Sequence, residues 1–312
     1  MQIGKRLLLS LLSFTCYFLF SGTPVTYAQT QPETSCSQKF PMSKCINNLA
    51  EIIPELTSAN IIYLGESHDS EIDHQNQLTI IQQLHQRNSK IAIAMEMFQR
   101  PYQKFIDQYL AGKITEEELV KKTEYEKRWG FPWELYAPIL RFAKQHKLPV
   151  LAANTPSEIT RKVSRSGLKS LTAEEKKLIP PFKEIRTDNE EYRKLVLAAF
   201  EQHQSGGHGN SPNMERFFLA QVLWDETMAE TIAQFQQRNP KHQIVVLAGL
   251  GHIIYGYGIP SRVERRLHSR PKNQKFTQRS LLLSPPSDIP INKQKPIADL
   301  ILESENKNIN TP

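Results

Sequence analysis

The sequence predicts an α/β fold in which a mainly parallel central sheet is flanked by helices, with a helical lobe or cap. Short β-branched runs alternate with amphipathic stretches along the chain, a pattern typical of β-α-β units. The chain has 312 residues, of which 39% are hydrophobic, so it can bury one substantial core. Two of the apolar runs lead into a Gly-x-x-His sequence, and this repetition points to a functional site.

The strands are expected where short apolar runs stop at turn-forming residues. In chain order these runs are 60–64, 91–96, 148–152, 243–248, 279–283 and 298–302.

Helices are expected between these strands. Residues Ile72 to Gln86 place Leu78, Ile81 and Leu84 on one apolar face. Residues 99–146 also read as helical, with a helix starting at Thr115. A second helical segment, about 172–240, is expected to form the lobe, with a flexible glycine-rich interruption at 205–210.

Residues 1–28 resemble a signal peptide. Lys5 and Arg6 precede an apolar stretch from Leu7 to Phe20, and Ala28 offers a cleavage position. The apolar stretch is shorter than the roughly 20 residues of a spanning helix. We therefore expect export to the periplasm or cell envelope. Lipoprotein anchoring through Cys16 is less favoured, because the small residues that normally precede a lipidated cysteine are missing.

The segment 29–56 contains Cys36 and Cys45, the cysteines that remain after the leader. In an exported chain they favour a local disulfide, the alternative being two unpaired thiols. The α/β domain is expected to span 57–303, followed by a flexible tail at 304–312.

The net charge of +7 comes from 39 basic and 32 acidic residues, which are spread thinly. Such a balance is no nucleic-acid footprint, and we expect no nucleic-acid partner. One local basic excess could attract carboxylates or simply be a solvated helix end. It comprises Arg262, Arg265, Arg266, Arg270 and Lys272.

Several familiar motifs are missing from the sequence. There is no Gly-x-Ser-x-Gly elbow, no P-loop and no Cys-x-x-Cys-His haem attachment. Serine hydrolases, nucleotide-binding enzymes and c-type cytochromes therefore lose support.

Four polar side chains follow apolar strands and are the candidate site. Glu66 and His68 follow the first strand, Glu96 closes the second, and His252 follows the strand at 243–248. The carboxyl ends of parallel strands line the ligand crevice of an open α/β sheet. We therefore expect these four residues to meet in one pocket.

This set of residues suits two kinds of chemistry. His68, His252 and Glu96 could ligate a divalent metal such as zinc. The same groups, with Glu66, could instead carry out acid–base catalysis. In the simpler alternative, Glu66 only caps the next helix and His68 is an ordinary turn residue.

Further candidates lie near the same strand ends. Asn154 follows the third strand and could project into the crevice or cap a helix. Asp225 interrupts an apolar helix face and could pair with a core arginine, which we favour, or face the site. Tyr255 and Tyr257 lie in a glycine-rich loop and could stack on a planar ligand, bind ferric iron or only pack. His208 reads as a solvated loop residue.

Four blocks of this chain resemble the ChaN family of haem-binding uptake proteins in the Tiki/erythromycin-esterase superfamily. The resemblance covers about residues 50–303 and implies an exported α/β protein with a helical lobe. It is carried by Tyr63-Leu64-Gly65-Glu66-Ser67-His68, the Glu96 strand end, Trp224-Asp225-Glu226-Thr227-Met228-Ala229 and the run from Gly251-His252 to Pro260-Ser261-Arg262.

The resemblance also implies a ligand and partners. Haem would lie at a homodimer interface, with tyrosine as the iron ligand and histidine assisting, and membrane uptake machinery would accept it. The cofactor-binding candidates are then Tyr255, Tyr257, Arg262 and Asn154.

The wider superfamily also includes hydrolases. By similarity, their two histidines and one glutamate map onto His68, His252 and Glu96, with Glu66 alongside. Haem or iron handling is the favoured function. The alternative is a hydrolase, either metal-dependent or metal-free. A structural protein with a vestigial site is the least favoured interpretation.

Overall fold

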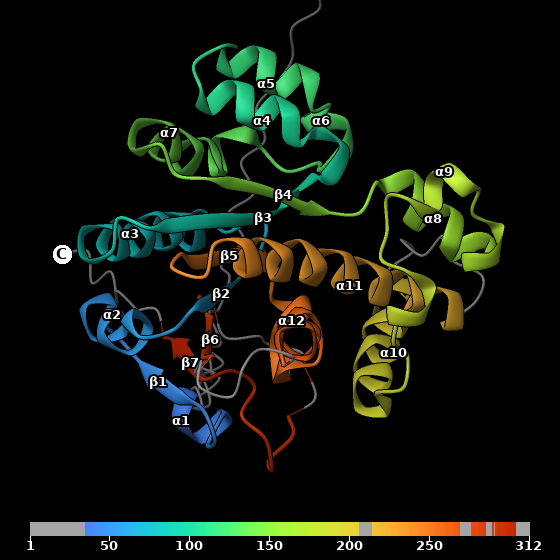
Figure 1. Ribbon diagram of the computed structural model, residues 1–312. Coiled ribbons are helices and arrows are strands. Elements are labelled where there is room, and N and C mark those ends of the chain that lie inside the picture. The colour runs from blue at the N-terminus through green and yellow to red at the C-terminus, as the bar shows by residue number, and fades with distance from the viewer. Residues whose placement is uncertain (1–34, 206–213, 269–275, 285–288, 290, 304–312) are drawn as a thin grey trace, which may run out of the picture. The chain divides into compact units, whose positions relative to one another are not determined.

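The computed structural model describes residues 35–205, 214–268, 276–284, 289 and 291–303 (Figure 1). The predicted signal peptide at 1–28, His208 with the glycine-rich stretch from 206 onward, Arg270, Lys272 and the predicted tail at 304–312 lie outside the described residues.

The centre of the fold is a seven-stranded sheet in the order β1-β7-β6-β2-β5-β3-β4. Every neighbouring pair is parallel, which confirms the predicted fold class. The strands are β1 (Lys44–Ile46), β2 (Ile61–Glu66), β3 (Ile91–Gln99), β4 (Val150–Asn154), β5 (Gln243–Gly249), β6 (Gln278–Leu282) and β7 (Leu300–Leu302).

Each expected strand is present, but the first Gly-x-x-His turn begins later than predicted. Gly65 lies inside β2, which continues to Glu66. A Cβ atom at Gly65 would lie 2.8 Å from Cδ2 of Leu282 on the neighbouring strand β6. Glycine is therefore needed here for close packing of side chains, and it does not end the strand. The edge strand β1 was not predicted.

Helices cover both faces of the sheet, as Figure 1 shows. The helices α2, α3, α4 and α7 pack on one face of the central strands, and α11 and α12 pack on the other face. The helices are α1 (Cys36–Lys39), α2 (Leu49–Thr57), α3 (Glu71–Arg87), α4 (Gln103–Leu110), α5 (Glu116–Lys122), α6 (Tyr125–Arg128), α7 (Ala137–His146), α8 (Ser157–Ser166), α9 (Ala173–Lys176), α10 (Glu190–Ser205), α11 (Met214–Arg238) and α12 (Ile259–Leu267).

The helix expected at 72–86 is α3, and the helix expected to start at Thr115 is α5. Thr115 caps α5, since its hydroxyl accepts a hydrogen bond from the backbone N–H of Glu118. Within the segment expected to be helical at 172–240, the described residues form α9, α10 and α11. The second half of α11 packs on the sheet through Met228 and Ile232, while α8 and α10 pack on its first half.

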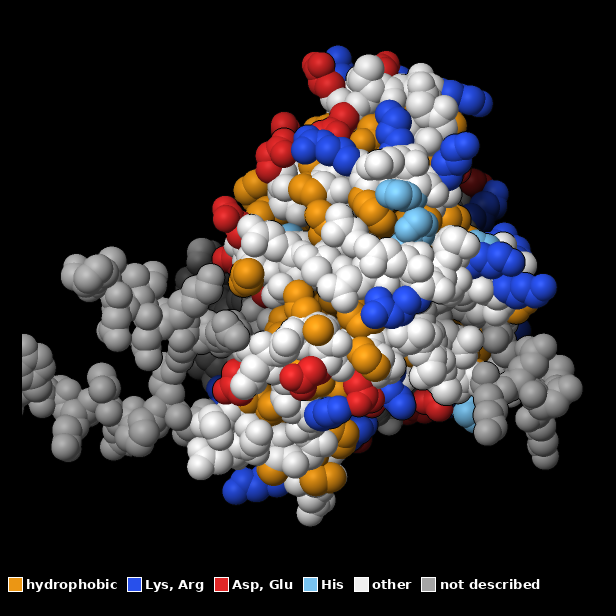
Figure 2. Space-filling model, turned by 90° about the vertical axis from the view of Figure 1, so that its left-hand side faces the viewer, with side chains coloured by type: hydrophobic (Ala, Val, Ile, Leu, Met, Phe, Trp, Pro, Cys, Tyr) orange, Lys and Arg blue, Asp and Glu red, His pale blue; other side chains and the backbone are white. Residues whose placement is uncertain are grey.

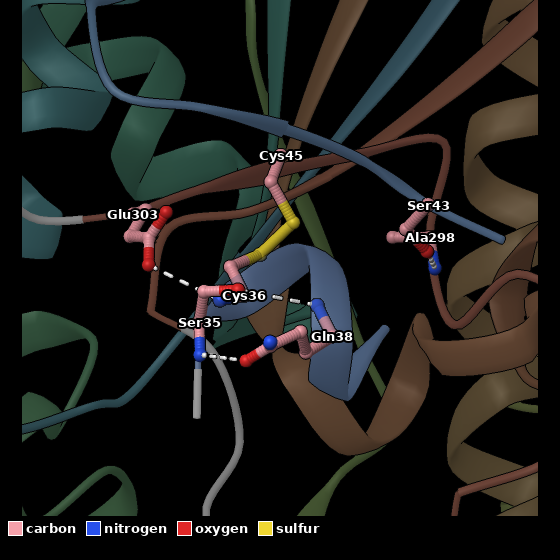
Figure 3. The surroundings of a disulfide bond; sticks show 7 residues. All are labelled: Ser35, Cys36, Gln38, Ser43, Cys45, Ala298 and Glu303. Atoms are coloured by element: carbon pink, nitrogen blue, oxygen red, sulfur yellow. Dashed lines mark hydrogen bonds between the residues drawn. A yellow bond between two sulfur atoms is a disulfide. The ribbon is translucent and has the colours of Figure 1, made fainter. Parts of the chain in front are cut away.

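Cys36 and Cys45 form the expected disulfide, with their Cα atoms 6.1 Å apart (Figure 3). The bridge joins α1 to β1. The backbone N–H of Cys36 also donates to Oε1 of Glu303, just after β7. The disulfide therefore ties the start of the described chain to the edge of the sheet.

Figure 2 shows the side of the molecule where α2, α3 and α7 lie, and there acidic and basic side chains are interspersed. Within the described ranges, no helix is both long enough and apolar enough to cross a membrane.

Candidate functional site

The two histidine turns lie side by side because β2 and β5 are neighbours in the sheet. Glu66, the last residue of β2, pairs in register with Gly249, the last residue of β5. β3, which carries Glu96, pairs with β5 on its other side. The structure thus brings Glu66, His68, Glu96 and His252 together at the carboxyl ends of three adjacent strands.

Glu66 holds His68 in place. Oε1 of Glu66 lies 2.9 Å from Nδ1 of His68 and also accepts a 2.6 Å hydrogen bond from the Tyr136 hydroxyl. Its Oε2 atom accepts a hydrogen bond from the amide of Gln77. The buried carboxylate is therefore well satisfied, and it fixes the orientation of the imidazole.

The other side of His68 is walled by aromatic rings. Trp129 meets the imidazole edge-on at a centroid distance of 4.7 Å, and Phe131 lies 5.0 Å away. The side chain of His68 keeps 26% of its surface exposed. It is the most accessible of the four strand-end side chains, since Glu66, Glu96 and His252 are buried.

His252 is buried between two carboxylates. Its Nε2 atom lies 3.3 Å from Oε1 of Glu96, and its Nδ1 atom lies 2.7 Å from Oδ1 of Asp225. The second oxygen of Glu96 accepts a 2.8 Å hydrogen bond from the backbone N–H of Gly249. Both ring nitrogens of His252 thus donate to acids.

Burial alone would keep the His252 imidazole neutral, but the charges of Glu96 and Asp225 and their hydrogen bonds raise its pKa to about 10. Burial likewise opposes ionisation of Glu96, yet the positive charge and hydrogen bond of His252 lower the pKa of that carboxyl to about 2. At neutral pH, His252 is therefore an imidazolium held between carboxylates.

The pKa of His68 is shifted in the same direction as that of His252. Burial lowers the pKa of His68, but the hydrogen bond that its Nδ1 donates to Glu66 and the charge of Glu96 outweigh burial, so the pKa is raised. The positive charge of His252 opposes protonation of His68. Of the two imidazoles, His68 is the more exposed, and a neighbouring positive charge opposes its protonation.

Two glycines make this packing possible. A Cβ atom at Gly249 would lie 2.8 Å from both Cε1 and Nε2 of His68. At Gly258 it would lie 2.2 Å from the backbone oxygen of His252 and 3.0 Å from Oδ1 of Asp225. Any side chain at either position would displace one of the two histidines.

Asp225 faces the site, contrary to the pairing with an arginine that we favoured from sequence. It accepts hydrogen bonds from His252 and from the buried hydroxyl of Tyr192. The arginines pair instead with its neighbour Glu226. That carboxylate lies 2.7 Å from Arg265 and 2.6 Å from Arg266, so the basic cluster is partly neutralised rather than simply solvated.

Sequence reasoning missed several residues that support the site. Tyr136 and Gln77 bind Glu66, whereas Tyr192 binds Asp225 and Gln221 lies 3.2 Å from Nδ1 of His252. The sequence offered one signal for such residues, a polar side chain on an apolar helix face. We recognised that signal only at Asp225.

Two of the expected cofactor-binding residues are structural. The side-chain amide of Asn154 donates to the backbone oxygen of Glu96, and its oxygen accepts from the backbone N–H of Thr155. Arg262 is buried, lies 3.3 Å from Glu226, and donates to the backbone oxygen of Gly258. Backbone groups thus engage both side chains, and a buried acid pairs with Arg262.

The two tyrosines line a different pocket, of about 250 Å³, together with Lys194 and Asn292. Tyr255 is buried, and its hydroxyl accepts a 3.0 Å hydrogen bond from the backbone N–H of Asn292. Tyr257 is half-buried, with the Lys295 ammonium 4.1 Å from its ring centroid. Neither His68 nor His252 is among the residues that line this pocket.

The metal site expected from His68, Glu96 and His252 is not found. Among the described residues, no three histidine, cysteine or acidic side chains are grouped so that they could hold a metal ion. The physical reason is that both nitrogens of His252 are engaged by carboxylates.

A solved structure shares this fold, and other known proteins are similar to the chain. ChaN of Campylobacter jejuni, solved with cofacially bound haem, superposes with a TM-score of 0.60 at 19% identity, over 80% of this chain and 89% of that one. The erythromycin esterase EreC gives a TM-score of 0.42 at 14% identity, over 75% of this chain and 72% of the enzyme.

A curated relative is the chloroplastic protein RETICULATA-RELATED 5 of Arabidopsis thaliana. It is 26% identical over 265 residues, which are 79% of this chain and 34% of that protein. The chain therefore spans about a third of the length of this relative.

Residues 52–263 match the family described as haem-binding uptake, Tiki superfamily, ChaN. This range includes both histidine turns, Glu96, Asp225 and the helices that support them. The chain therefore belongs to the ChaN family of the Tiki superfamily.

Proposed function

We propose that this protein binds haem at the strand-end site, which is formed by Glu66, His68, Glu96 and His252. It would handle the haem outside the cytoplasm, in haem or iron uptake. The observation that carries the proposal is the family match over 52–263, which contains every residue of that site. The tyrosines at 255 and 257 are not assigned to the iron, because they line a separate pocket.

The imidazole of His68 is suited to bind the haem iron. Haem iron is commonly held by a histidine nitrogen. Glu66 occupies Nδ1, and nothing among the described residues hydrogen-bonds to Nε2, so Nε2 is the nitrogen left for a ligand. A carboxylate behind a ligating histidine fixes its tautomer and raises its basicity. Trp129 and Phe131 provide apolar contacts for a flat macrocycle.

The test is a titration of the purified protein with hemin, followed by the Soret band. We expect a saturable shift in the wild type and an affinity weakened at least about tenfold in His68→Ala. Tyr257→Phe is the matched control and should bind as the wild type does. Absence of a saturable shift would remove the haem proposal. Loss of binding in Tyr257→Phe with retention in His68→Ala would move haem to the tyrosine pocket.

Export, a homodimer and delivery to membrane uptake machinery belong to the same proposal. The basic and apolar leader at residues 1–28 supports export, and disulfides such as Cys36–Cys45 persist in oxidising compartments. The cofacial haem binding named for Campylobacter jejuni ChaN is compatible with a dimer, in which each copy would bring one haem. Fractionation of producing cells tests export, and gel filtration with and without hemin tests the dimer.

Hydrolysis is the second candidate, favoured by one specific observation. Both histidines are backed by carboxylates, as in a general base oriented by an acid. His68 would accept the proton of an attacking water, and the imidazolium of His252 would stabilise developing negative charge. Hydrolysis of ester or peptide panels that disappears in Glu96→Gln but survives in Tyr257→Phe would establish it.

A further inference from the structure

A second pocket lies beside the strand-end site, between α8 and the first half of α11. It has a volume of about 300 Å³, the lower end of the range for small-molecule sites. The α8 side is polar and basic, whereas the α11 side is apolar. The pocket plays no part in the hydrogen-bond network of the four strand-end residues.

The basic wall is made by Arg161 and Arg165, one helical turn apart on α8. Both side chains are exposed, and among the described residues neither guanidinium forms an ion pair. Their neighbours differ: Lys162 pairs with Glu175 at 2.8 Å, and Arg128 pairs with Glu158 at 2.7 Å. The charge of Arg161 acts on nearby Glu158, but no described carboxylate holds either guanidinium in an ion pair. Two such adjacent guanidiniums are well suited to an oxyanion, because each can donate two parallel hydrogen bonds.

The apolar wall is made by Phe217, Ala220 and Trp224, which are spaced three and four residues apart on one face of α11. Phe217 and Trp224 are half-buried and offer ring surface to a flat molecule. The lining therefore combines charge for an acidic group with aromatic surface for an apolar body.

The pocket adjoins the strand-end site on two sides. Trp224 meets His252 edge-on at a centroid distance of 6.2 Å. Ser157, at the start of α8, accepts a hydrogen bond from Arg128, and the residue after Arg128 is Trp129, which packs on His68. A ligand held in this pocket would thus contact Trp224, whose ring meets that of His252.

We propose that the α8–α11 pocket binds the anionic end of a flat, apolar ligand whose body contacts the strand-end site. The ligand class is an aromatic or macrocyclic molecule with a carboxylate or sulfonate group. This inference rests on one part of the proposed function, namely that a ligand binds at the strand-end site. It assigns specificity to Arg161 and Arg165 rather than to the arginines of α12.

The test compares Arg161→Gln/Arg165→Gln with the matched variant Arg87→Gln/Lys90→Gln, which removes two exposed charges at the end of α3. The probe is metal-free protoporphyrin IX, with its dimethyl ester as the form that lacks carboxylates. We expect the free acid to bind the α8 variant at least about tenfold more weakly than the wild type and the control. The ester should bind all three proteins alike. Equal affinity of the free acid for all three overturns the inference.

The experiment separates this inference from the haem proposal. If the wild type binds neither hemin nor protoporphyrin, the haem proposal fails, and 8-anilinonaphthalene-1-sulfonate then probes the pocket by itself. Loss of its fluorescence in the α8 variant alone supports the pocket, and unchanged fluorescence overturns it. Circular dichroism and melting temperatures confirm that each variant is folded.

Discussion

The imidazole of His68 lies against the backbone of Gly249, so that a methyl group there would come within 2.8 Å of two ring atoms. The contact joins the first histidine turn to the end of the strand that carries the second. Gly249 has a negative φ of −55°, so alanine is tolerated by the backbone itself. The effect of a substitution at this position should therefore come from the displaced ring.

We expect Gly249→Ala to weaken hemin binding about tenfold or more, because a 1 Å displacement at a site is costly. Gly251→Ala is the matched control, since a Cβ atom there meets nothing within 4 Å. Hemin titration of both variants is the measurement. Equal affinities would show that the position of His68 does not matter for the ligand.

The Glu96–His252 pair should make stability depend on pH. The pKa of His252 rises from 6.5 to about 10 on folding, so its contribution is complete below pH 6.5 and is lost as pH rises toward 10. The pKa of Glu96 falls from 4.5 to about 2, so its contribution is complete above pH 4.5 and is lost as pH falls toward 2. Both contributions are therefore complete between about pH 4.5 and 6.5.

Denaturant unfolding of His252→Gln measures this contribution. The variant should be less stable than the wild type by about 3–5 kcal/mol at pH 6, because it leaves two buried carboxylates without their cation. The difference should shrink as pH approaches 10. A constant difference between pH 6 and 10 would contradict the assigned charge of His252.

Asp225→Asn should lower the pKa of His252, since it removes one of the two carboxylates that hold the imidazolium. NMR titration of the imidazole resonances gives the pKa directly. Tyr192→Phe is the control, because it removes a hydrogen bond to Asp225 but keeps the carboxylate. An unchanged pKa in Asp225→Asn would mean that Glu96 alone determines the charge of His252.

Glu226→Gln should destabilise the protein by about 3–5 kcal/mol while leaving the affinity for hemin unchanged. The buried carboxylate pairs with Arg262, Arg265 and Arg266, which would lose their counter-charge. Thermal unfolding and hemin titration of the same preparation provide both measurements. A large loss of hemin affinity in a folded variant would return Arg262 to the ligand site.

The double variant Cys36→Ser/Cys45→Ser should lower the free energy of unfolding by about 2.5 kcal/mol, the loop-closure entropy of a short bridge. The two cysteines are nine residues apart, at the edge of the sheet away from the histidines. Hemin affinity should not change. Denaturant unfolding with and without reductant, which should mimic the variant, checks the effect.

Much of the fold was predictable because its signals are local. Apolar runs such as 243–248 identify buried strands, and alternation with helices identifies a parallel sheet. The meeting of His68 and His252 followed from one further rule, that parallel strands end on the same edge. Gly65 was wrongly predicted to end its strand. It is needed for close packing against Leu282, a residue far away in the sequence.

The residues that complete the site were not predictable in the same way. Tyr192 comes from α10 and Tyr136 from the start of α7, so their contacts depend on how distant helices pack. Tyr255 has a backbone φ of 56°, which is a rare value for a non-glycine residue. The local sequence pattern does not predict this conformation. Arg262 looked available because the sequence does not show that Glu226 is buried beside it.

The hydrogen bond from Cys36 to Glu303 places the two ends of the described chain at one corner of the sheet, beside β1 and β7. β4 forms the opposite border, and the histidine turns follow the central strand β2 and its neighbour β5. A tether, tag or fused domain joined at either end would thus depart from the same corner. For the same reason, a circular permutant that links Glu303 to Ser35 by a short peptide and opens a surface loop elsewhere should preserve the arrangement of the strands.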